Sequence, residues 1–395
     1  MMAERVYLDW NATAPLRPQA RQALQDAAAL TGNPSSVHAE GRAARRLIES
    51  ARAQVAELVG ARSADVFFTS GGTEANMLAL TPAIETASEK RPRERLLISA
   101  VEHPSVRAGG RFLPTAIDEI PVAADGRIEL GALADAVARA SRPLVSLMLA
   151  NNETGVLQPV TQAASIVHAA GGLLHVDAVQ AVGRIPCDLA ALGADLLTIS
   201  AHKIGGPQGV GALVRRSEDI HFADPHIRGG GQERGMRAGT ENVAGIAAFG
   251  AAAAASRLQV VEESAYTLAL RSLLEQGLRA ITPAAVIFGT GATAAERLPN
   301  TTLFALDGMK AETAVIAFDL EGIAVSSGAA CSSGKVQPSH VLAAMGVLPE
   351  LLRGAIRVSL GWASSEADVE RFLGAWRKVS SALSRGSKEQ RGMAA

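Results

Sequence analysis

Polar and titratable side chains stand directly after five apolar runs of the sequence. They are Ser70 to Asn76, Glu102 with His103, Asn151 to Glu153, Asp177 with Gln180 three residues on, and Ser200 to Lys203. The runs are short and continuously apolar, as buried parallel strands are. Because ligands bind beyond the carboxyl ends of such strands in an open sheet, we expect these side chains to converge on one site.

The segment Gly71-Gly72-Thr73 opens a predicted helix, where free backbone N–H groups and a hydroxyl can hold a phosphate. An ordinary turn in which Thr73 caps the helix explains the same residues. The segment has neither a Walker lysine nor the three-glycine dinucleotide fingerprint. If it does hold a phosphate, a small phosphorylated cofactor suits it better than a nucleotide.

Lys203 ends a predicted strand and is followed by the turn Ile204 to Pro207, so it is expected to be partly desolvated. Taken alone, it is better explained as a solvated surface lysine, because lysine is mostly exposed. Asp177 at a neighbouring strand end favours a chemical role. A phosphate cradle, a lysine for a Schiff base and a carboxylate for a pyridinium nitrogen are the three parts of a pyridoxal-phosphate site, which acts as an electron sink.

The two cysteines have opposite surroundings. Cys331 lies among Ser, Gly and Ala residues that cannot pack a core, which favours a nucleophile. Cys187 lies among bulkier residues and is predicted to be structural. The histidines show no ligand spacing, so no metal site is expected, and His175 is expected to pack near Asp177.

Composition sets the class of molecule. The 395 residues are 48% hydrophobic and 19% charged, and they carry a formal charge of −1, which offers no broad electrostatic surface for nucleic acid or anionic lipid. With no apolar leader and with Val243 to Ala255 too short to span a bilayer, we expect a cytoplasmic protein, no membrane partner and a small-molecule substrate. Two cysteines fit a reducing compartment.

The elements that must position these residues follow a βαβ pattern, which predicts an α/β fold. The expected strands are 65–69, 96–100, 144–150, 172–176, 196–199 and 210–214. A long helix over 243–280 then leads to a smaller α+β unit with apolar runs at 285–288, 302–306 and 323–326 and a helix at 366–383. The polar tail 386–395 is expected to be disordered.

Ordered motifs along nearly the whole chain resemble those of the group I cysteine desulfurases, which are fold-type I pyridoxal-phosphate enzymes of the class V aminotransferase superfamily. The motifs are Tyr7 to Thr13, Gly32 to His38, Thr69 to Asn76, Asn151 to Gly155, His175 to Gln180, Ser200 to Lys203, Gly229 to Glu233, Arg237 to Thr240 and Ser326 to Gly334. The resemblance implies a large domain built on a mostly parallel seven-stranded sheet between helices, with a smaller α+β domain. We expect residues 15–255 to form the large cofactor-binding domain, and 1–14 with 256–385 the small domain that carries the nucleophile.

The resemblance also implies residue roles. Pyridoxal 5'-phosphate would be attached to Lys203, its nitrogen paired with Asp177, its ring hydroxyl contacted by Gln180 and its ring stacked by His103, which would also move protons. The phosphate would be held by Gly72, Thr73, Ser200 and His202, and by Thr240 of a second subunit in a homodimer. The substrate carboxylate would be bound by Asn152 and Arg357.

The implied reaction converts L-cysteine to L-alanine, leaves the sulfur on Cys331 as a persulfide and passes it to an acceptor protein such as an iron–sulfur scaffold or a tRNA-thiolation relay. Selenocysteine lyase activity shares every part up to the sulfur step, and transamination or epimerisation would make Cys331 dispensable. A non-catalytic assembly component would not need Lys203, Asp177 and Cys331. Two departures from the family pattern are Trp362, where arginine is usual, and Ala329-Ala330-Cys331, where Ser-Ala-Cys is common.

Overall fold

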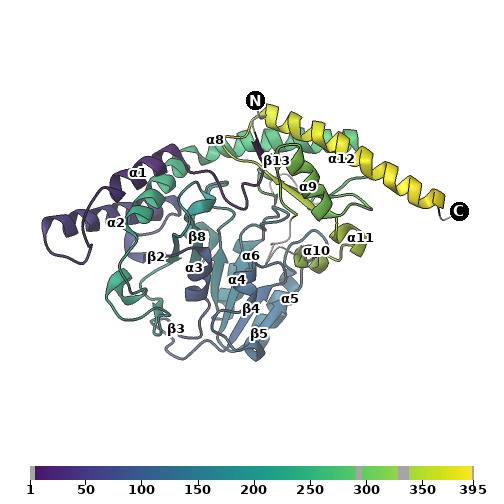
Figure 1. Cartoon of the computed structure of the whole chain (residues 1–395). Helices are drawn as coiled ribbons and strands as arrows, with labels where there is room; N and C mark the ends of the chain where they lie inside the picture. Colours follow the sequence, from purple (N-terminus) through teal and green to yellow (C-terminus); the bar gives the residue numbers. More distant parts are fainter. Residues whose placement is uncertain (1–4, 291–295, 328–337, 394–395) are drawn as a thin grey trace.

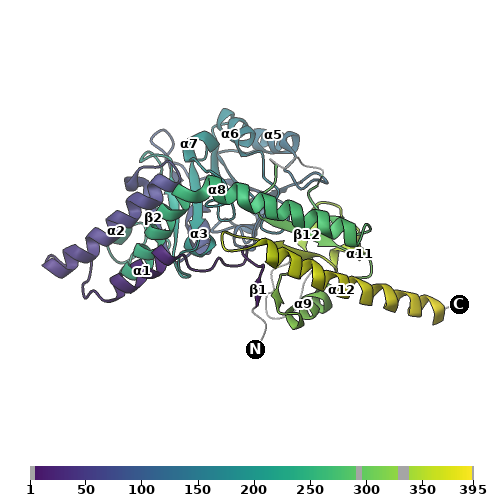
Figure 2. The same cartoon turned by 90° about the horizontal axis from the view of Figure 1, so that it is seen from above.

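The computed structural model describes residues 5–290, 296–327 and 338–393, with side chains up to residue 381. The predicted nucleophile Cys331 lies outside the described residues. A large sheet flanked by helices forms one part of the molecule, and a smaller group of helices and strands lies beside it (Figure 1). The long helix α8 (Val243–Ile281) runs through both parts (Figure 2).

The large sheet has seven strands in the order β2-β9-β8-β7-β6-β4-β5. Their bounds are β2 Val66–Thr69, β4 Arg95–Ser99, β5 Ile117–Ile120, β6 Pro143–Met148, β7 Leu173–Asp177, β8 Leu196–Ser200 and β9 Gly211–Arg215. Strand β9 runs antiparallel to both of its neighbours, β2 and β8, and all other neighbouring strands of this sheet pair in parallel. The predicted α/β class and mostly parallel sheet are confirmed, and six of the strands match the predicted runs.

Six of the seven strands, all but the edge strand β5, are buried on both faces, which explains why they read as largely apolar. In β4, Leu97 packs on one side, while Leu96 and Ile98 pack on the other. The first face is covered by α2 (Ala39–Leu58), α5 (Leu130–Arg139), α6 (Val160–Ala169), α7 (Leu189–Leu192) and the start of α8, and the second by α3 (Gly72–Ala79) and α4 (Pro104–Arg107). A short antiparallel pair, β3 (Ile84–Glu85) and β10 (His221–Phe222), extends the second side.

Helix α8 matches the predicted long helix and begins at an Asn242 cap, whose side chain accepts a hydrogen bond from the N–H of Gly245 at 3.0 Å. Its alanine-rich first half packs closely on α1 (Pro18–Ala28) and α2. A Cβ at Gly250 would lie only 2.5 Å from the Cα of Ala51. By length and composition α8 could cross a membrane, but 61% of its most apolar stretch is buried inside the protein. We therefore interpret α8 as a helix of the protein core.

The smaller part contains the three-stranded sheet β11-β12-β14 and the parallel pair β1-β13. The bounds are β1 Val6–Tyr7, β11 Val286–Ile287, β12 Thr301–Ala305, β13 Ile323–Ala324, β14 Ile356–Ser359, α9 Ala311–Leu320, α10 His340–Ala344, α11 Pro349–Leu352 and α12 Glu366–Met393. Its core joins the N-terminal strand to the second half of α8, α9 and α12. Residues from the two ends of the chain therefore share one core.

The predicted disordered tail is wrong for most of its length, because α12 continues to Met393. The tail contains Lys388, Glu389, Gln390 and Arg391, which have high helix propensity, and it extends a helix already held by the core. Polarity alone therefore did not indicate disorder here.

Candidate active site

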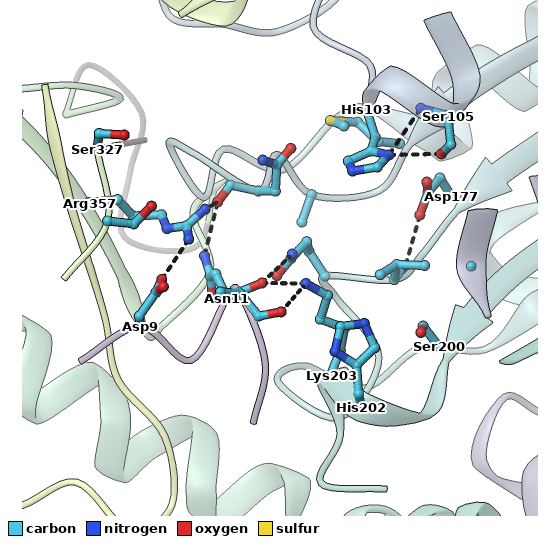
Figure 3. A pocket seen from close by; sticks show the side chains of 18 of the residues that line it. Asp9, Asn11, His103, Ser105, Asp177, Ser200, His202, Lys203, Ser327 and Arg357 are labelled. Carbon is cyan, nitrogen blue, oxygen red and sulfur yellow. Dashed lines mark hydrogen bonds and ion pairs between the residues drawn. The ribbon is translucent and has the colours of Figure 1, made fainter. Parts of the chain in front are cut away.

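A cavity of about 730 Å³ opens at the carboxyl ends of the large sheet, where the smaller part of the protein closes over it. Of the predicted site residues that the structure describes, all but Thr240 line it: Gly72, Thr73, His103, Asn152, Asp177, Gln180, Ser200, His202, Lys203 and Arg357. Arg357 and Asp9 lie at one end of the cavity, His103 and Asp177 lie at the other, and Lys203 lies between (Figure 3). These side chains therefore lie together where the strands end, as expected from the sequence.

Asp177 is the last residue of β7 and is 6% exposed. Its carboxylate accepts hydrogen bonds from Nδ2 of Asn76 at 2.8 Å and from the N–H of Val179 at 3.0 Å. Asn76, on α3, also donates to Oγ of Ser105 at 2.9 Å. These donors fix the orientation of the carboxylate at the end of β7.

His103 is the N-cap of α4, and Nδ1 accepts a hydrogen bond from the N–H of Ser105 at 3.2 Å. Because Nδ1 is an acceptor, the proton of the neutral ring is assigned to Nε2. Burial lowers the pKa of His103. The ring is therefore a neutral group that can stack and can exchange a proton through Nε2.

Lys203 ends a short 3-10 turn, Ala201–Lys203, directly after β8. Its Nζ donates to the carbonyl oxygens of Asn11 at 2.5 Å and Ala12 at 2.8 Å. Burial, followed by the charges of Arg184 and Arg357, lowers the pKa of Lys203 to about 7. Lys203 is therefore a partly buried amine that is neutral far more often than a surface lysine.

The glycine turn before α3 faces a second hollow of about 430 Å³, which shares Gly72, Thr73, Ser200 and His202 with the main cavity. Helix α3 is capped at Gly71 with no side-chain hydrogen bond, so the alternative in which Thr73 caps the helix is wrong. A Cβ at residue 72 would lie 3.0 Å from Cγ2 of Val179.

Burial and Lys203 lower the pKa of His202 to about 4. The hollow therefore offers free helix N–H groups, hydroxyls and a neutral imidazole, which are suitable donors for a phosphate.

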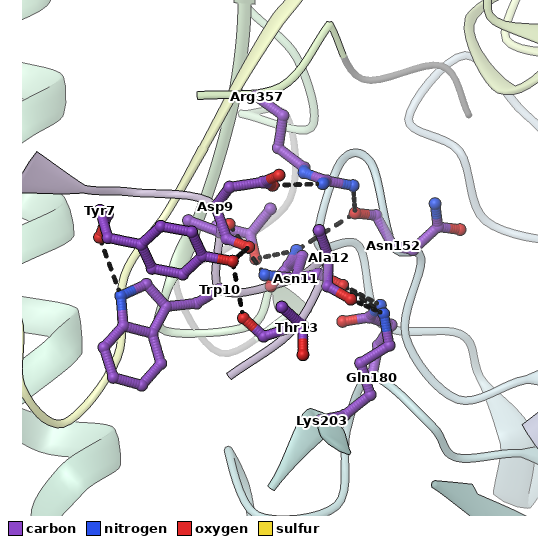
Figure 4. A network of polar contacts seen from close by, with 12 residues as sticks. Tyr7, Asp9, Trp10, Asn11, Ala12, Thr13, Asn152, Gln180, Lys203 and Arg357 are labelled. Atoms are coloured by element: carbon purple, nitrogen blue, oxygen red, sulfur yellow. Dashed lines mark hydrogen bonds and ion pairs between the residues drawn. The ribbon is translucent and has the colours of Figure 1, made fainter. Parts of the chain in front are cut away.

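Arg357 projects from β14 and forms an ion pair with Asp9 at 2.7 Å. It also donates to the backbone oxygen of Asn152 at 3.0 Å (Figure 4). Its Nε is buried and has no hydrogen-bond partner among the residues that the structure describes. A buried guanidinium with an unused donor can receive a further acceptor such as a carboxylate.

Among the predicted site residues that the structure describes, Thr240 does not line this cavity. Thr240 is exposed and lines a separate hollow of about 170 Å³, so within one chain it does not reach the site. Cys331 lies outside the described residues, whereas Cys187 is buried and burial raises the pKa of its thiol to about 12. His175 is buried between Oγ of Ser146 and Oγ1 of Thr198, at 2.8 and 2.9 Å.

Trp362 replaces the arginine that is usual in the family and contacts two other side chains. It meets Trp10 edge to face with ring centroids 4.7 Å apart, and the guanidinium of Arg17 lies 3.8 Å from its ring centroid. Arg17 is itself paired with Glu263. A cation–aromatic stack thus occupies this position.

Pyridoxal phosphate fits these residues. Within the described part of the chain, Oδ1 of Asn76 and Nε of Arg357 are buried and have no hydrogen-bond partner. Both residues line the main cavity. A buried donor or acceptor without a hydrogen-bond partner lowers the stability of the protein, unless a bound ligand supplies that partner. A desolvated lysine, a carboxylate fixed by two hydrogen bonds and a hollow rich in hydrogen-bond donors lie around the same space.

The fold and site define a fold-type I pyridoxal-phosphate enzyme. The family model for class-V aminotransferases matches residues 6–372. The chain belongs to the class-V aminotransferase family and, within it, to the cysteine desulfurases. It is 45% identical over 378 residues to a cysteine desulfurase of Cereibacter sphaeroides, covering 94% of each chain. It is 39% identical to an IscS-like cysteine desulfurase of Mycobacterium tuberculosis, covering 93% of this chain and 94% of the relative. The crystal structure of a NifS-like protein from Rickettsia africae superimposes with a TM-score of 0.86 at 37% identity, covering 96% of this chain and all of the other.

Several residues of the site carried no sequence prediction. Asp9, Asn11, Asn76 and Ser105 all line the main cavity. Three of them lie in or beside the quoted motifs, which indicated a site but not which partner each side chain meets. Their contacts join segments up to 348 residues apart, as between Asp9 and Arg357.

Proposed function

We propose that this protein is a pyridoxal-phosphate-dependent cysteine desulfurase that converts L-cysteine to L-alanine and transfers the sulfur to Cys331. The observation that carries the proposal is a desolvated Lys203 in one cavity with Asp177 and Arg357, in a chain of the cysteine desulfurase family.

The cofactor would be held at both of its ends. Lys203 would attach it covalently, Asp177 would pair with its ring nitrogen, and Gln180 would contact its ring oxygen. Gly72, Thr73, Ser200 and His202 would bind its phosphate. When bound, pyridoxal phosphate withdraws electrons from the substrate Cα and so acidifies the proton there.

The substrate would be oriented by its carboxylate. Arg357 has the unused Nε, and Asn152 lies against its guanidinium. The carboxylate must compete with Asp9 for Arg357, so binding is expected to rearrange this ion pair. An amine with a pKa of about 7 is suited to accept the Cα proton near neutral pH, which assigns that step to Lys203. His103, with its proton on Nε2, is placed to donate or accept a second proton.

The sulfur step is a nucleophilic attack by the Cys331 thiolate on the substrate sulfur. A sulfur–sulfur bond forms as the substrate carbon–sulfur bond breaks, and the carbon keeps the electron pair and is then protonated to give alanine. Cys187 cannot take this role, because it is buried with a raised thiol pKa.

The remaining parts of the proposal concern the assembly and its partners. We propose a homodimer in which Thr240 of one subunit completes the phosphate site of the other, which its exposed position outside its own cavity permits. Residues 15–255 would bind the cofactor, and 1–14 with 256–385 would close the site. The persulfide would pass to an acceptor such as an iron–sulfur scaffold, in the cytoplasm, where Cys331 stays reduced.

The experiment is alanine formation from L-cysteine by the purified, pyridoxal-phosphate-loaded protein. We expect Lys203→Ala to abolish alanine formation and Cys331→Ser to reduce it by several orders of magnitude, while Cys187→Ser retains it. Equal alanine formation by Cys331→Ser and the parent would refute the persulfide route and favour selenocysteine lyase or aminotransferase chemistry.

A further inference from the structure

Arg184 is a buried cation behind the cavity wall, and it does not line the main cavity. Its Nη1 donates to the backbone oxygen of Gln180 at 2.6 Å and to Oε1 of the same residue at 2.9 Å. Its Nη2 donates to the backbone oxygen of Trp10 at 3.2 Å. In the described part of the chain, all of its hydrogen-bond acceptors are neutral, so no carboxylate explains why a charge is buried here.

These contacts decide the orientation of the Gln180 amide. A guanidinium has donors only, so the amide atom that faces Arg184 must be the oxygen. The amide nitrogen must then point the other way, and Nε2 of Gln180 donates to the backbone oxygen of Asn11 at 3.0 Å (Figure 4). The same oxygen accepts the Lys203 amine. Gln180 therefore presents an N–H donor beside the lysine.

We propose that Arg184 is a positioning residue that holds the Gln180 amide with its N–H toward the cofactor's ring oxygen. The inference rests on the proposed function, because it assumes that pyridoxal phosphate occupies the cavity. Without Arg184, the amide can rotate and place its oxygen against the ring oxygen, where two acceptors repel each other.

The charge of Arg184 also favours attachment of the cofactor at Lys203. Arg184 and Lys203 line one small hollow next to Trp10 and Trp362. Burial is the largest cause of the lowered pKa of Lys203 and of His202, and the charge of the Arg184 guanidinium lowers both further. Its charge helps to keep the attaching amine neutral, while its donors orient the neighbouring amide.

The test is a double-mutant cycle on the equilibrium dissociation constant for pyridoxal phosphate, measured by absorbance titration of the full-length protein. We expect Arg184→Met to weaken binding about fivefold or more in the parent background and clearly less in a Gln180→Leu background, where no amide remains to be oriented. Arg184→Lys keeps a donor and a charge and should restore most of the affinity.

Arg17→Met is the matched control, because Arg17 is also buried but pairs with Glu263 and does not contact Gln180. Its effect should be the same in both backgrounds. If Arg184→Met unfolds the protein, Arg184→Gln takes its place in the cycle, because its amide can donate or accept and so does not fix the orientation of the Gln180 amide.

An equal loss from Arg184→Met in the two backgrounds would overturn the inference and leave the proposed function intact. Failure of Arg184→Lys to restore affinity would also count against it. If the parent protein itself binds no pyridoxal phosphate, the proposed function fails, and the inference fails with it.

Discussion

The reactivity of Lys203 gives the most quantitative prediction. Its pKa of about 7 lies well below the ordinary value of 10.5. At pH 7 about half of such amines are neutral, against roughly one in three thousand for an ordinary lysine, so the nucleophilic form is enriched roughly a thousandfold. Burial is the largest cause, and Arg184 and Arg357 add to it, while Asp9 and Asp177 oppose it.

This prediction is tested by varying the pH at which the cofactor-free protein reacts with pyridoxal phosphate. Pyridoxal phosphate is added at a series of values between about pH 5.5 and pH 9.5, the reaction is trapped with borohydride, and the adduct on Lys203 is quantified by peptide mapping. We expect the attachment rate to reach half of its plateau near pH 7 and to be flat above about pH 8.

Asp9→Asn provides a directional control. Removing this carboxylate removes a charge that raises the lysine pKa, so the midpoint should move to lower pH. A rate that keeps rising about tenfold per pH unit up to pH 9, as for a lysine in a model peptide, would refute the reasoning. So would an upward shift of the midpoint in Asp9→Asn.

Three further predictions concern stability, packing and assembly. Burial raises the pKa of Glu153 to about 7, above its ordinary 4.5. Below about pH 4.5 the carboxyl is protonated in both the folded and the unfolded protein, so this pKa shift does not change the free energy of unfolding. Above about pH 7 the shift lowers the free energy of unfolding by its full amount. Glu153→Gln should therefore gain up to about 3 kcal/mol in unfolding free energy, measured with urea, only at neutral and higher pH; a gain that is the same at pH 4 contradicts this. Gly72→Val adds atoms that start 3.0 Å from the Val179 side chain, so titration should show at least about tenfold weaker cofactor binding, and unchanged affinity would be inconsistent with the cradle. Sedimentation should show a homodimer. In mixed dimers of Thr240→Ala and Lys203→Ala subunits, a shared site requires that one of the two cofactor sites has both side chains and the other has neither, so cofactor occupancy should differ between the two sites. A monomer that is fully occupied by the cofactor would exclude the shared site.

Much of the large sheet could be predicted from local sequence, because six of its strands are buried on both faces and are mostly apolar. The edge strand β5 was missed, since it carries Asp118 and Glu119 and presents one side to solvent. Strand β14 was missed because its four residues include the charged Arg357, although all four are buried.

The candidate site was predictable to the extent that strand ends of a parallel sheet meet at one edge. That rule placed Asp177, His103 and Lys203 together. It could not pair Arg357 with Asp9 or Asn76 with Asp177, because these contacts depend on how distant segments pack. Nor could it show that Arg184 holds Gln180, since a buried arginine without a carboxylate has no local signature in the sequence.

The central claim is that L-cysteine sulfur is transferred to Cys331 at a site built on Lys203. The most direct measurement is a single turnover of the pyridoxal-phosphate-loaded protein with L-cysteine in the absence of any reductant or acceptor, followed by peptide mass spectrometry and quantification of alanine. We predict one additional sulfur atom on the peptide that contains Cys331, an equal amount of alanine and an unmodified Cys187. Alanine formed without any sulfur on Cys331 would contradict the account.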